Sequence, residues 1–175
     1  MITINNNNED YQFVVACKSD TIEIMEIFEG AKSVEGCSWN ENYPTVDVVT
    51  EDLNNNVAYK MTIHNKIAAV ITIDGGNYEI ESSRAWQLSK HCYFWRMAVS
   101  SDSLKNGIGT ITLKAALKTA ENLGYKSARI LVADYNTPAL ALYTKFGFVK
   151  CDEMNEWGIN FYCMERGLTY NDENL

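Results

Sequence analysis

The spacing of apolar residues along the chain predicts four helices. In the segment "TITLKAALKTAENLGY", apolar residues recur at i, i+3, i+4 and i+7, which is the buried stripe of an amphipathic helix. The segment "TIEIMEIFEGAK" has the same spacing and predicts a first helix. Shorter helices are predicted for "TVDVVTEDLNNN" and for "NTPALALYTKFG", the second with Pro138 in its first turn and Gly147 at its end.

Runs of β-branched and aromatic residues between these segments predict strands. Two of them form an antiparallel hairpin that turns at His64, Asn65 and Lys66, so His64 is interpreted as a turn residue and not as a catalytic one. The predicted strands are "YQFVVA", "VAYKMTI", "KIAAVITID", "YFWRMAVSS", "ARILVAD", "FVKCDE" and "INFYCMER". The polar segment "GGNYEIESSRAWQLSKHC" opens as a loop and has no clear period.

Helix-capping signals accompany the predicted helices. Ser19 or Asp20 precedes the first helix, and Asn136 or Thr137 precedes the last one, as N-cap residues do. Gly124 stands where the third helix should end. Neither a repeat nor a linker interrupts the pattern, so we predict one α/β domain over residues 1–175.

Composition narrows the function classes. The chain of 175 residues is 46% apolar, which is typical of a protein with a packed core. Its formal net charge of -8 argues against nucleic acid as a partner and mildly favours a cationic one. No apolar run is long enough for a membrane span, and "MITINNNNED" is not a signal peptide.

The five cysteines are scattered, and neither they nor the two histidines have metal-ligand spacing. Scattered thiols in a chain of this length are typical of reduced core residues. A cytoplasmic protein without a bound metal is therefore predicted.

The segment "SLKNGIGT" at residues 103–110 follows a predicted strand and opens a predicted helix. Unpaired backbone N–H groups and the positive end of the helix dipole make such a place suitable for phosphate. The segment lacks the P-loop pattern, and Thr112 stands where a dinucleotide fingerprint has its third glycine. Taken alone, the two glycines favour an ordinary turn over a phosphate site.

The wider context resembles the GNAT family of acyl-CoA N-acyltransferases. A strand ending in R-M-A-V is followed by a short polar link, by G-x-G at a helix start and by a buried strand. The pattern N-x-x-A-x-x-L-Y-x-K-x-G-F then begins at Asn136, and "WNENYPT" resembles a segment of bacterial members. One departure is Leu104, where the family usually has Arg or Gln. The resemblance implies a mixed, mostly antiparallel twisted sheet, splayed between two central parallel strands and flanked by about four helices.

The resemblance also implies a binding site for acetyl-CoA as cosubstrate. Backbone groups of the strand would hold the pantetheine arm, and backbone N–H groups of the glycine segment would hold the pyrophosphate. The residues carried over are Met97, Ala98 and Val99 for the arm, Leu104, Lys105, Asn106, Gly107, Ile108, Gly109 and Thr110 for the phosphate loop, and Asn136, Ala139 and Tyr143 near the thioester.

Tyr143 is the candidate catalytic residue. Its phenol keeps its proton at pH 7 and can protonate the departing thiolate, although an aromatic residue on an amphipathic helix has the same pattern. A general base is less defined: Glu79 and Glu81 are candidates that also fit surface positions. Four aromatic residues fit either an acceptor pocket or the core, namely Trp39, Tyr43, Trp86 and Tyr93.

The predicted activity is therefore transfer of an acetyl group to an amine of a small molecule or peptide by direct attack on the thioester. The alternatives are a transferase that uses another acyl group or acceptor, and a non-catalytic domain that binds or senses acyl-CoA. The expected state is a monomer or a homodimer.

Overall fold

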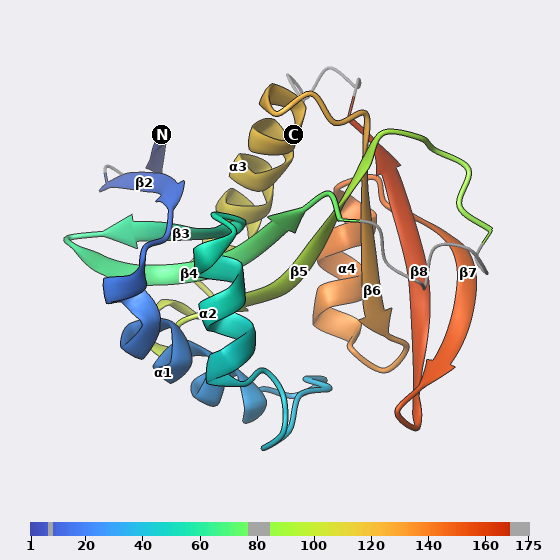
Figure 1. The fold of residues 1–175 in the computed structure, drawn as a ribbon, viewed down its shortest axis with the longest axis horizontal. Helices are drawn as coiled ribbons and strands as arrows, with labels where there is room; N and C mark the ends of the chain where they lie inside the picture. The colour runs from blue at the N-terminus through green and yellow to red at the C-terminus, as the bar shows by residue number, and fades with distance from the viewer. Residues whose placement is uncertain (7–8, 77–84, 169–175) are drawn as a thin grey trace. The chain divides into compact units, whose positions relative to one another are not determined.

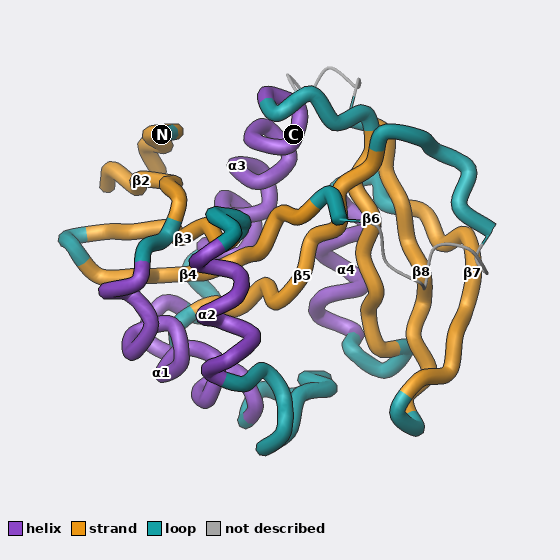
Figure 2. Tube along the Cα trace, viewed as in Figure 1, coloured by secondary structure: helices purple, strands orange, loops and turns teal. Residues whose placement is uncertain are grey.

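A computed structural model describes residues 1–6, 9–76 and 85–168. The described residues form both helices and strands (Figures 1 and 2). The helices are α1 (Thr21–Lys32), α2 (Val46–Asn54), α3 (Ile108–Asn122) and α4 (Thr137–Lys145), with short 3-10 helices η1 (Lys18–Asp20) and η3 (Ser101–Ser103). The strands are β1 (Ile2–Asn6), β2 (Glu9–Val15), β3 (Ala58–Ile63), β4 (Lys66–Asp74), β5 (His91–Val99), β6 (Ser127–Ala133), β7 (Val149–Glu156) and β8 (Ile159–Gly167).

The described strands form one eight-stranded sheet in the order β1-β2-β3-β4-β5-β6-β8-β7. Strands β5 and β6 run parallel, and the pairs at β1–β2, β2–β3, β3–β4, β6–β8 and β7–β8 are antiparallel. The predicted fold class is confirmed in its mostly antiparallel sheet, its parallel pair and its four α-helices.

The contacts divide the chain into two compact units, which are described separately. Unit 1 comprises residues 1–34, 39–73 and 96–116, and unit 2 comprises residues 35–38, 74–95 and 117–175. Strand β5 contributes its last four residues to unit 1 and its first five to unit 2. The single domain over residues 1–175 stays a prediction.

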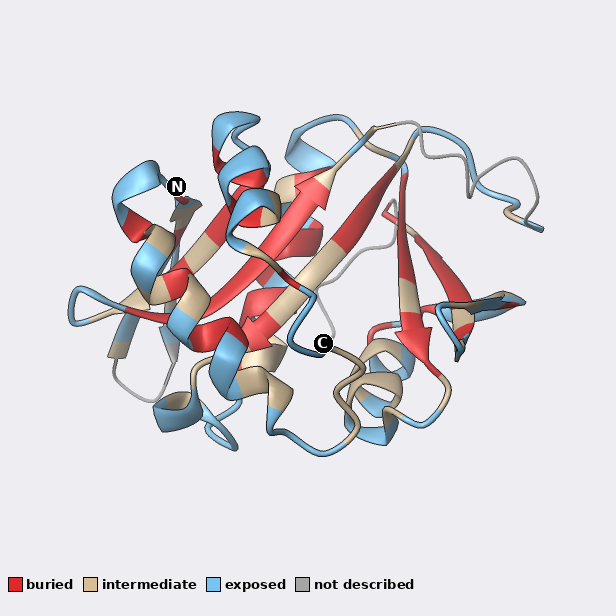
Figure 3. Ribbon diagram, turned by 60° about the horizontal axis from the view of Figure 1, so that its bottom comes forward, coloured by how far each residue is buried: buried red, intermediate tan, exposed pale blue. Residues whose placement is uncertain are grey.

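The core of unit 1 lies between its strands and the helices α1 and α2. Ile24, Ile27 and Phe28 of α1 are buried together with Val49 and Leu53 of α2, as the helical spacing predicted. They pack with Ala58, Ile67, Val70 and Ala98 of β3, β4 and β5. Figure 3 shows that the helices of this unit have both buried and exposed residues, with the exposed residues facing outward.

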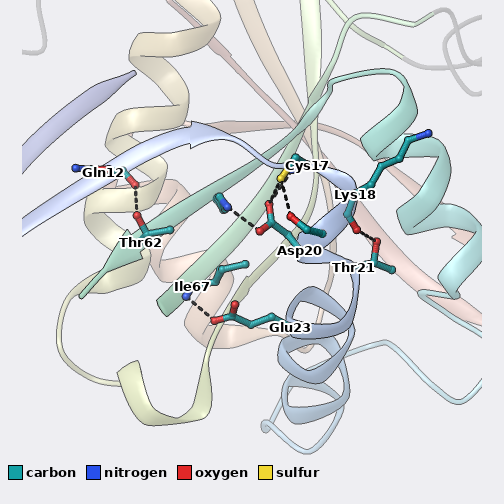
Figure 4. Close-up of polar contacts among 10 residues, drawn as sticks. Gln12, Cys17, Lys18, Asp20, Thr21, Glu23, Thr62 and Ile67 are labelled. Atoms are coloured by element: carbon teal, nitrogen blue, oxygen red, sulfur yellow. Dashed lines mark hydrogen bonds and ion pairs between the residues drawn. The ribbon is translucent and has the colours of Figure 1, made fainter. Parts of the chain in front are cut away.

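Polar contacts attach the start of α1 to the strands of unit 1 (Figure 4). Asp20 precedes α1 but makes no cap hydrogen bond to it. Instead, its carboxylate accepts from the backbone N–H of Cys17 at 2.7 Å and pairs with Lys60 of β3 at 2.7 Å. Glu23 of α1 accepts from the backbone N–H of Ile67 in β4 at 2.7 Å. Asp20 therefore has the predicted N-cap position but not the capping hydrogen bond. The Asp20 and Glu23 carboxylates instead join α1 to the sheet, because Lys60 and the Ile67 N–H lie within their reach.

Unit 2 contains two groups of packed apolar residues. Phe148, which follows α4, is buried and lies 5.7 Å from the ring of Tyr143 and 6.4 Å from that of Phe94 in β5. A second cluster contains Ala133 of β6 with Met154, Phe161 and Cys163 of the β7–β8 hairpin. Figure 1 shows this hairpin at the edge of the unit, with β8 beside β6.

The turn between β3 and β4 contains residues with positive φ. His64 and Asn65 both have positive φ and join β3 to β4, so the predicted turn is confirmed. The strand β1 was missed, because "ITINN" has too few apolar residues to stand out from a polar terminus. It pairs with β2 from Ile2 opposite Phe13 to Asn6 opposite Glu9.

No helix among the described residues has the length and apolar character that a membrane crossing requires.

All five cysteines are free thiols, as predicted. Cys17 is exposed, whereas Cys92 and Cys163 are fully buried, and burial raises the pKa of Cys92 to about 12. We expect a thiol reagent to label Cys17 in the folded protein, to label the two buried thiols only after unfolding, and to count five thiols then without reductant. Peptide mapping of the labelled sites measures this. A count of three would mean that a disulfide forms in solution.

Candidate active site

The last residues of β5 belong to unit 1 and contain the predicted binding strand for the pantetheine arm. Ala98 is buried in the core beside α1 and α2, while Met97 and Val99 are half-buried. The alternation of a strand therefore places Met97 and Val99 on the opposite face from Ala98. After this strand, the Ser100 N–H donates to the Ala68 carbonyl at 2.9 Å, which fixes the strand end against β4.

The phosphate loop, residues 104–110, lies at the start of α3. Helix α3 begins at Ile108, two residues earlier than "TITLKAALKTAENLGY" predicted, so Gly109 and Thr110 belong to its first turn. Ile108 is buried and anchors the helix start, whereas the preceding residues 104–107 are exposed. The Ile111 N–H donates to the Gly107 carbonyl at 3.1 Å, and the N–H groups before it have no earlier helical turn to bond.

These residues fit the diphosphate of a coenzyme. Gly107 has φ of +77°, and a methyl group there would meet no atom within 4 Å, so the space before the loop is open. The first turn of α3 carries no acidic side chain, and Lys105 supplies a positive charge. Backbone N–H groups, a helix dipole and a cation at one exposed place are the donors that a diphosphate requires. Leu104 contributes no charge, so a diphosphate at this place would depend on the backbone and Lys105.

Arg96 precedes the binding strand and is bound at several points in unit 1. Its Nε donates to Asp52 Oδ2 at 2.8 Å and its second guanidinium nitrogen to Asp52 Oδ1 at 2.7 Å. The third nitrogen donates to the Tyr43 hydroxyl at 3.0 Å. The motif R-M-A-V contains this arginine but does not indicate a role for its side chain. Its partners are distant in sequence, so spacing could not identify them.

In unit 2, Asn136 is the N-cap of α4, and its side-chain oxygen accepts from the Ala139 N–H at 3.2 Å. Gly36 lies so close that a methyl group on it would be 3.0 Å from the Asn136 Cα. The predicted cap is confirmed, so part of the amide is used within the fold.

We expect Asn136→Ala to lower stability by about 1 kcal/mol, because the α4 cap is lost. Asn136→Asp should retain most of that stability, since a carboxylate caps equally well. Thermal unfolding measures both. If the amide also contacts the pantetheine arm, Asn136→Asp weakens acetyl-CoA binding in calorimetry while the melting temperature stays unchanged. If Asn136→Asp and the unsubstituted protein bind acetyl-CoA with equal affinity, the role of Asn136 is limited to capping α4.

Tyr143 lies one turn after Ala139 on α4, and both side chains are half-buried. The Tyr143 ring packs against Phe148 with an interplanar angle of 65°. Burial raises the pKa of Tyr143 to about 12. The phenol is therefore fully protonated at neutral pH.

The other candidates have different outcomes. Glu79 and Glu81 lie outside the residues that the structure describes. Tyr93 has no exposed surface, and its ring stacks on Trp95 at 4.9 Å, so it is a core residue. Trp39 packs edge-on against Phe28 of α1 at 5.2 Å. Among the four aromatic candidates, Tyr43 is the exposed one, with 36% of its surface accessible.

A hollow of about 460 Å³ in unit 2 is lined by residues 86–91 and Arg129. Arg129 lies over the Trp86 ring at 4.7 Å and donates to the Leu88 carbonyl at 2.8 Å. Its charge is compensated by Glu165 at 3.9 Å, which also accepts the N–H groups of Gln87 and Leu88. These contacts assign Trp86 and Arg129 a structural role, in which they hold residues 86–88 against β6 and β8.

Comparison with known proteins gives a family. The acetyltransferase (GNAT) family model matches residues 23–148, which include the end of β5, residues 104–110 and α4. YwnH of Bacillus subtilis (strain 168) is 38% identical to this chain over 53 residues. It is named as a phosphinothricin acetyltransferase. That match spans 30% of this chain and 29% of YwnH, less than a third of each.

Solved structures share the fold at low sequence identity. A GNAT acetyltransferase of Streptococcus agalactiae 2603 has a TM-score of 0.77 at 17% identity, covering 90% of this chain and 95% of that one. The ribosomal-protein-S18-alanine N-acetyltransferase of Escherichia coli has 0.71 at 16%, covering 94% and 98%. YncA of Salmonella typhimurium, solved with acetyl-CoA, has 0.71 at 14%, covering 92% and 95%.

Proposed function

Since the chain belongs to the GNAT acetyltransferase family, we propose that it moves an acetyl group from acetyl-CoA to an amine of a small molecule or peptide. The family makes the chain an acyltransferase with acetyl-CoA as its cosubstrate. The observation that carries the site assignment is the exposed start of α3, where open space, the N–H groups of the first helical turn and Lys105 occur together.

Binding is assigned first. Backbone groups of Met97, Ala98 and Val99 hold the pantetheine arm, and the N–H groups of residues 106–110 hold the diphosphate. Hydrogen bonds to an anion stabilise by roughly 1.5–3 kcal/mol each, so several of them offset the entropy lost when a flexible coenzyme is ordered. A strand N–H at Ala98 or Val99 stabilises the negative charge that develops on the acyl oxygen.

Tyr143 supplies the proton in the proposed transfer. Bound acetyl-CoA supplies an activated thioester, and attack by a neutral amine expels a thiolate. The Tyr143 hydroxyl donates its proton as the carbon–sulfur bond breaks. The pKa of Tyr143, about 12, is higher than the pKa of an ordinary thiol, which disfavours full proton transfer to the leaving thiolate. Burial raises the pKa of a thiol as well, and this reduces the difference. The hydroxyl therefore acts best as a donor to the sulfur while the bond is breaking.

The acceptor amine must lose a proton before it attacks, because an alkyl amine has a pKa of about 10.4. The sequence of β5, "HCYFWRMAV", contains no carboxylate. Glu79 and Glu81 stay candidates, and a chain of water molecules is the other route for the proton. The net charge of -8 favours a cationic acceptor such as a polyamine or an aminoglycoside-like compound.

A screen for thiol release tests the proposal. The panel contains polyamines, aminoglycosides, a peptide with an N-terminal alanine and phosphinothricin, the last two because similar proteins are named for them. Acceptor-dependent release of CoA thiol supports catalysis. Tight binding of acetyl-CoA in calorimetry, without release for any amine, would support the alternative of a non-catalytic acyl-CoA sensor. Absence of acetyl-CoA binding would contradict both.

A further inference from the structure

The backbone of β5 is interrupted at Arg96. This residue has φ of +49° inside a strand that continues to Val99. Side chains other than glycine, asparagine and aspartate seldom adopt positive φ, because Cβ approaches the neighbouring carbonyl oxygen. Arginine has no local preference for this conformation. Contacts elsewhere in unit 1 must therefore hold it.

Those contacts form a clamp made of Arg96, Asp52, Tyr43 and Thr72. The guanidinium makes two parallel hydrogen bonds to the Asp52 carboxylate, and both side chains are only 11% exposed. A bidentate bond between opposite charges fixes the direction of the side chain as well as its distance. The Tyr43 hydroxyl accepts a third hydrogen bond from the guanidinium at 3.0 Å.

Each partner of Arg96 is itself held by another part of unit 1. Asp52 belongs to α2 and also accepts from the buried Thr72 hydroxyl of β4 at 2.8 Å. Tyr43 forms a two-bond bridge with the backbone of Asn40, at 3.1 and 3.2 Å. The clamp therefore joins β5 to α2, to β4 and to the segment between α1 and α2.

We propose that Arg96 is a positioning residue, an inference that rests on the proposed function. The clamp imposes the positive φ at residue 96, and this conformation orients the Met97–Val99 backbone for acyl-CoA. Ala98 lies in the core, and the Ser100 N–H is bonded to Ala68, so the strand beyond Arg96 has one register. If residue 96 relaxed to an extended conformation, the N–H and C=O groups of the next residues would turn away from their present directions.

Replacement by alanine and by glycine separates this role from simple stabilisation. Both substitutions delete the clamp, but glycine adopts positive φ without steric cost, whereas alanine does not. We expect Arg96→Ala to bind acetyl-CoA about tenfold more weakly than Arg96→Gly in calorimetry. Glycine is ordinarily the more destabilising residue in a strand, so a purely structural role predicts the reverse order.

A matched control removes Arg129, another buried arginine that is paired with a carboxylate. Arg129→Ala breaks the contacts with Glu165 and Trp86 in unit 2, and we expect a lower melting temperature with unchanged acetyl-CoA affinity. A loss of affinity equal to that of Arg96→Ala would show a general effect of destabilisation and would overturn the proposal. Equal affinities of Arg96→Ala and Arg96→Gly would overturn it as well.

Asp52→Asn keeps the proposal testable if Arg96→Ala does not fold. This change removes the charge that holds the guanidinium, so it should weaken acetyl-CoA binding in the natural chain and have little effect in Arg96→Gly, where no guanidinium remains. Equal weakening in both backgrounds would contradict the clamp. If the unsubstituted protein fails to bind acetyl-CoA, the proposed function itself is wrong and this inference falls with it.

Discussion

Tyr143→Phe should lower kcat by roughly 10²–10⁴, the range for a lost general acid, with little change in acetyl-CoA affinity. The substitution removes only the hydroxyl and keeps the ring that packs on Phe148. The measurement is thiol release at saturating acetyl-CoA with an amine found in the panel, normalised to folded protein. Tyr135→Phe, at an exposed residue just before α4, is the control and should keep its rate.

The pH dependence adds a second criterion for Tyr143. Its pKa is near 12 in the folded chain and near 10 in an unfolded one, so the folded state holds this proton more tightly. Stability from this group is full below pH 10 and is lost as the pH rises from about 10 to 12. A rate controlled by Tyr143 should accordingly not fall through pH 10. A normal rate in Tyr143→Phe would leave water as the proton source.

Gly107→Glu should abolish acetyl-CoA binding, with a loss of at least about 100-fold in affinity. The change adds a negative charge where the diphosphate is expected and removes the freedom that φ of +77° requires. Calorimetry with acetyl-CoA measures it. Lys105→Glu reverses the charge beside the loop and should weaken binding less, because the backbone donors remain.

Gly124→Glu is the matched control for the strain at Gly107. Gly124 follows the other end of α3, has φ of +89° and also faces open space. Its substitution has a comparable conformational cost far along the helix from the phosphate loop, so acetyl-CoA affinity should not change. If Gly107→Glu binds as tightly as the unsubstituted chain, the diphosphate does not lie at this loop.

Local patterns predicted most of the fold. The apolar stripe of α3, the hairpin turn at His64 and Asn65, and the Asn136 cap all depend on residues within a few positions of each other, so sequence spacing identifies them. The strand β1 depends on pairing with β2, because its residues are mostly polar. The role of Asp20 likewise depends on Lys60, forty residues away.

The candidate site divides in the same way. The starts of α3 and α4 could be predicted because glycine and capping residues mark them in the sequence, whereas contact of these residues with the coenzyme stays a prediction from the family motifs. The clamp at Arg96 could not, since Asp52 and Tyr43 are 44 and 53 residues away and the positive φ leaves no mark in composition. The sequence does not predict which residues would line a pocket for the acceptor, because aromatic residues such as Tyr93 have the same pattern in a core as in a pocket.

The division into two compact units has a spectroscopic consequence. The four tryptophans are Trp39, Trp86, Trp95 and Trp157, and only Trp39 belongs to unit 1. Its indole packs against the core of α1 and α2, while Trp157, 82% exposed, emits from water. In a chain with phenylalanine at the other three positions, fluorescence would report the first unit alone. Comparison with circular dichroism then tells whether the units melt in one cooperative transition or in two.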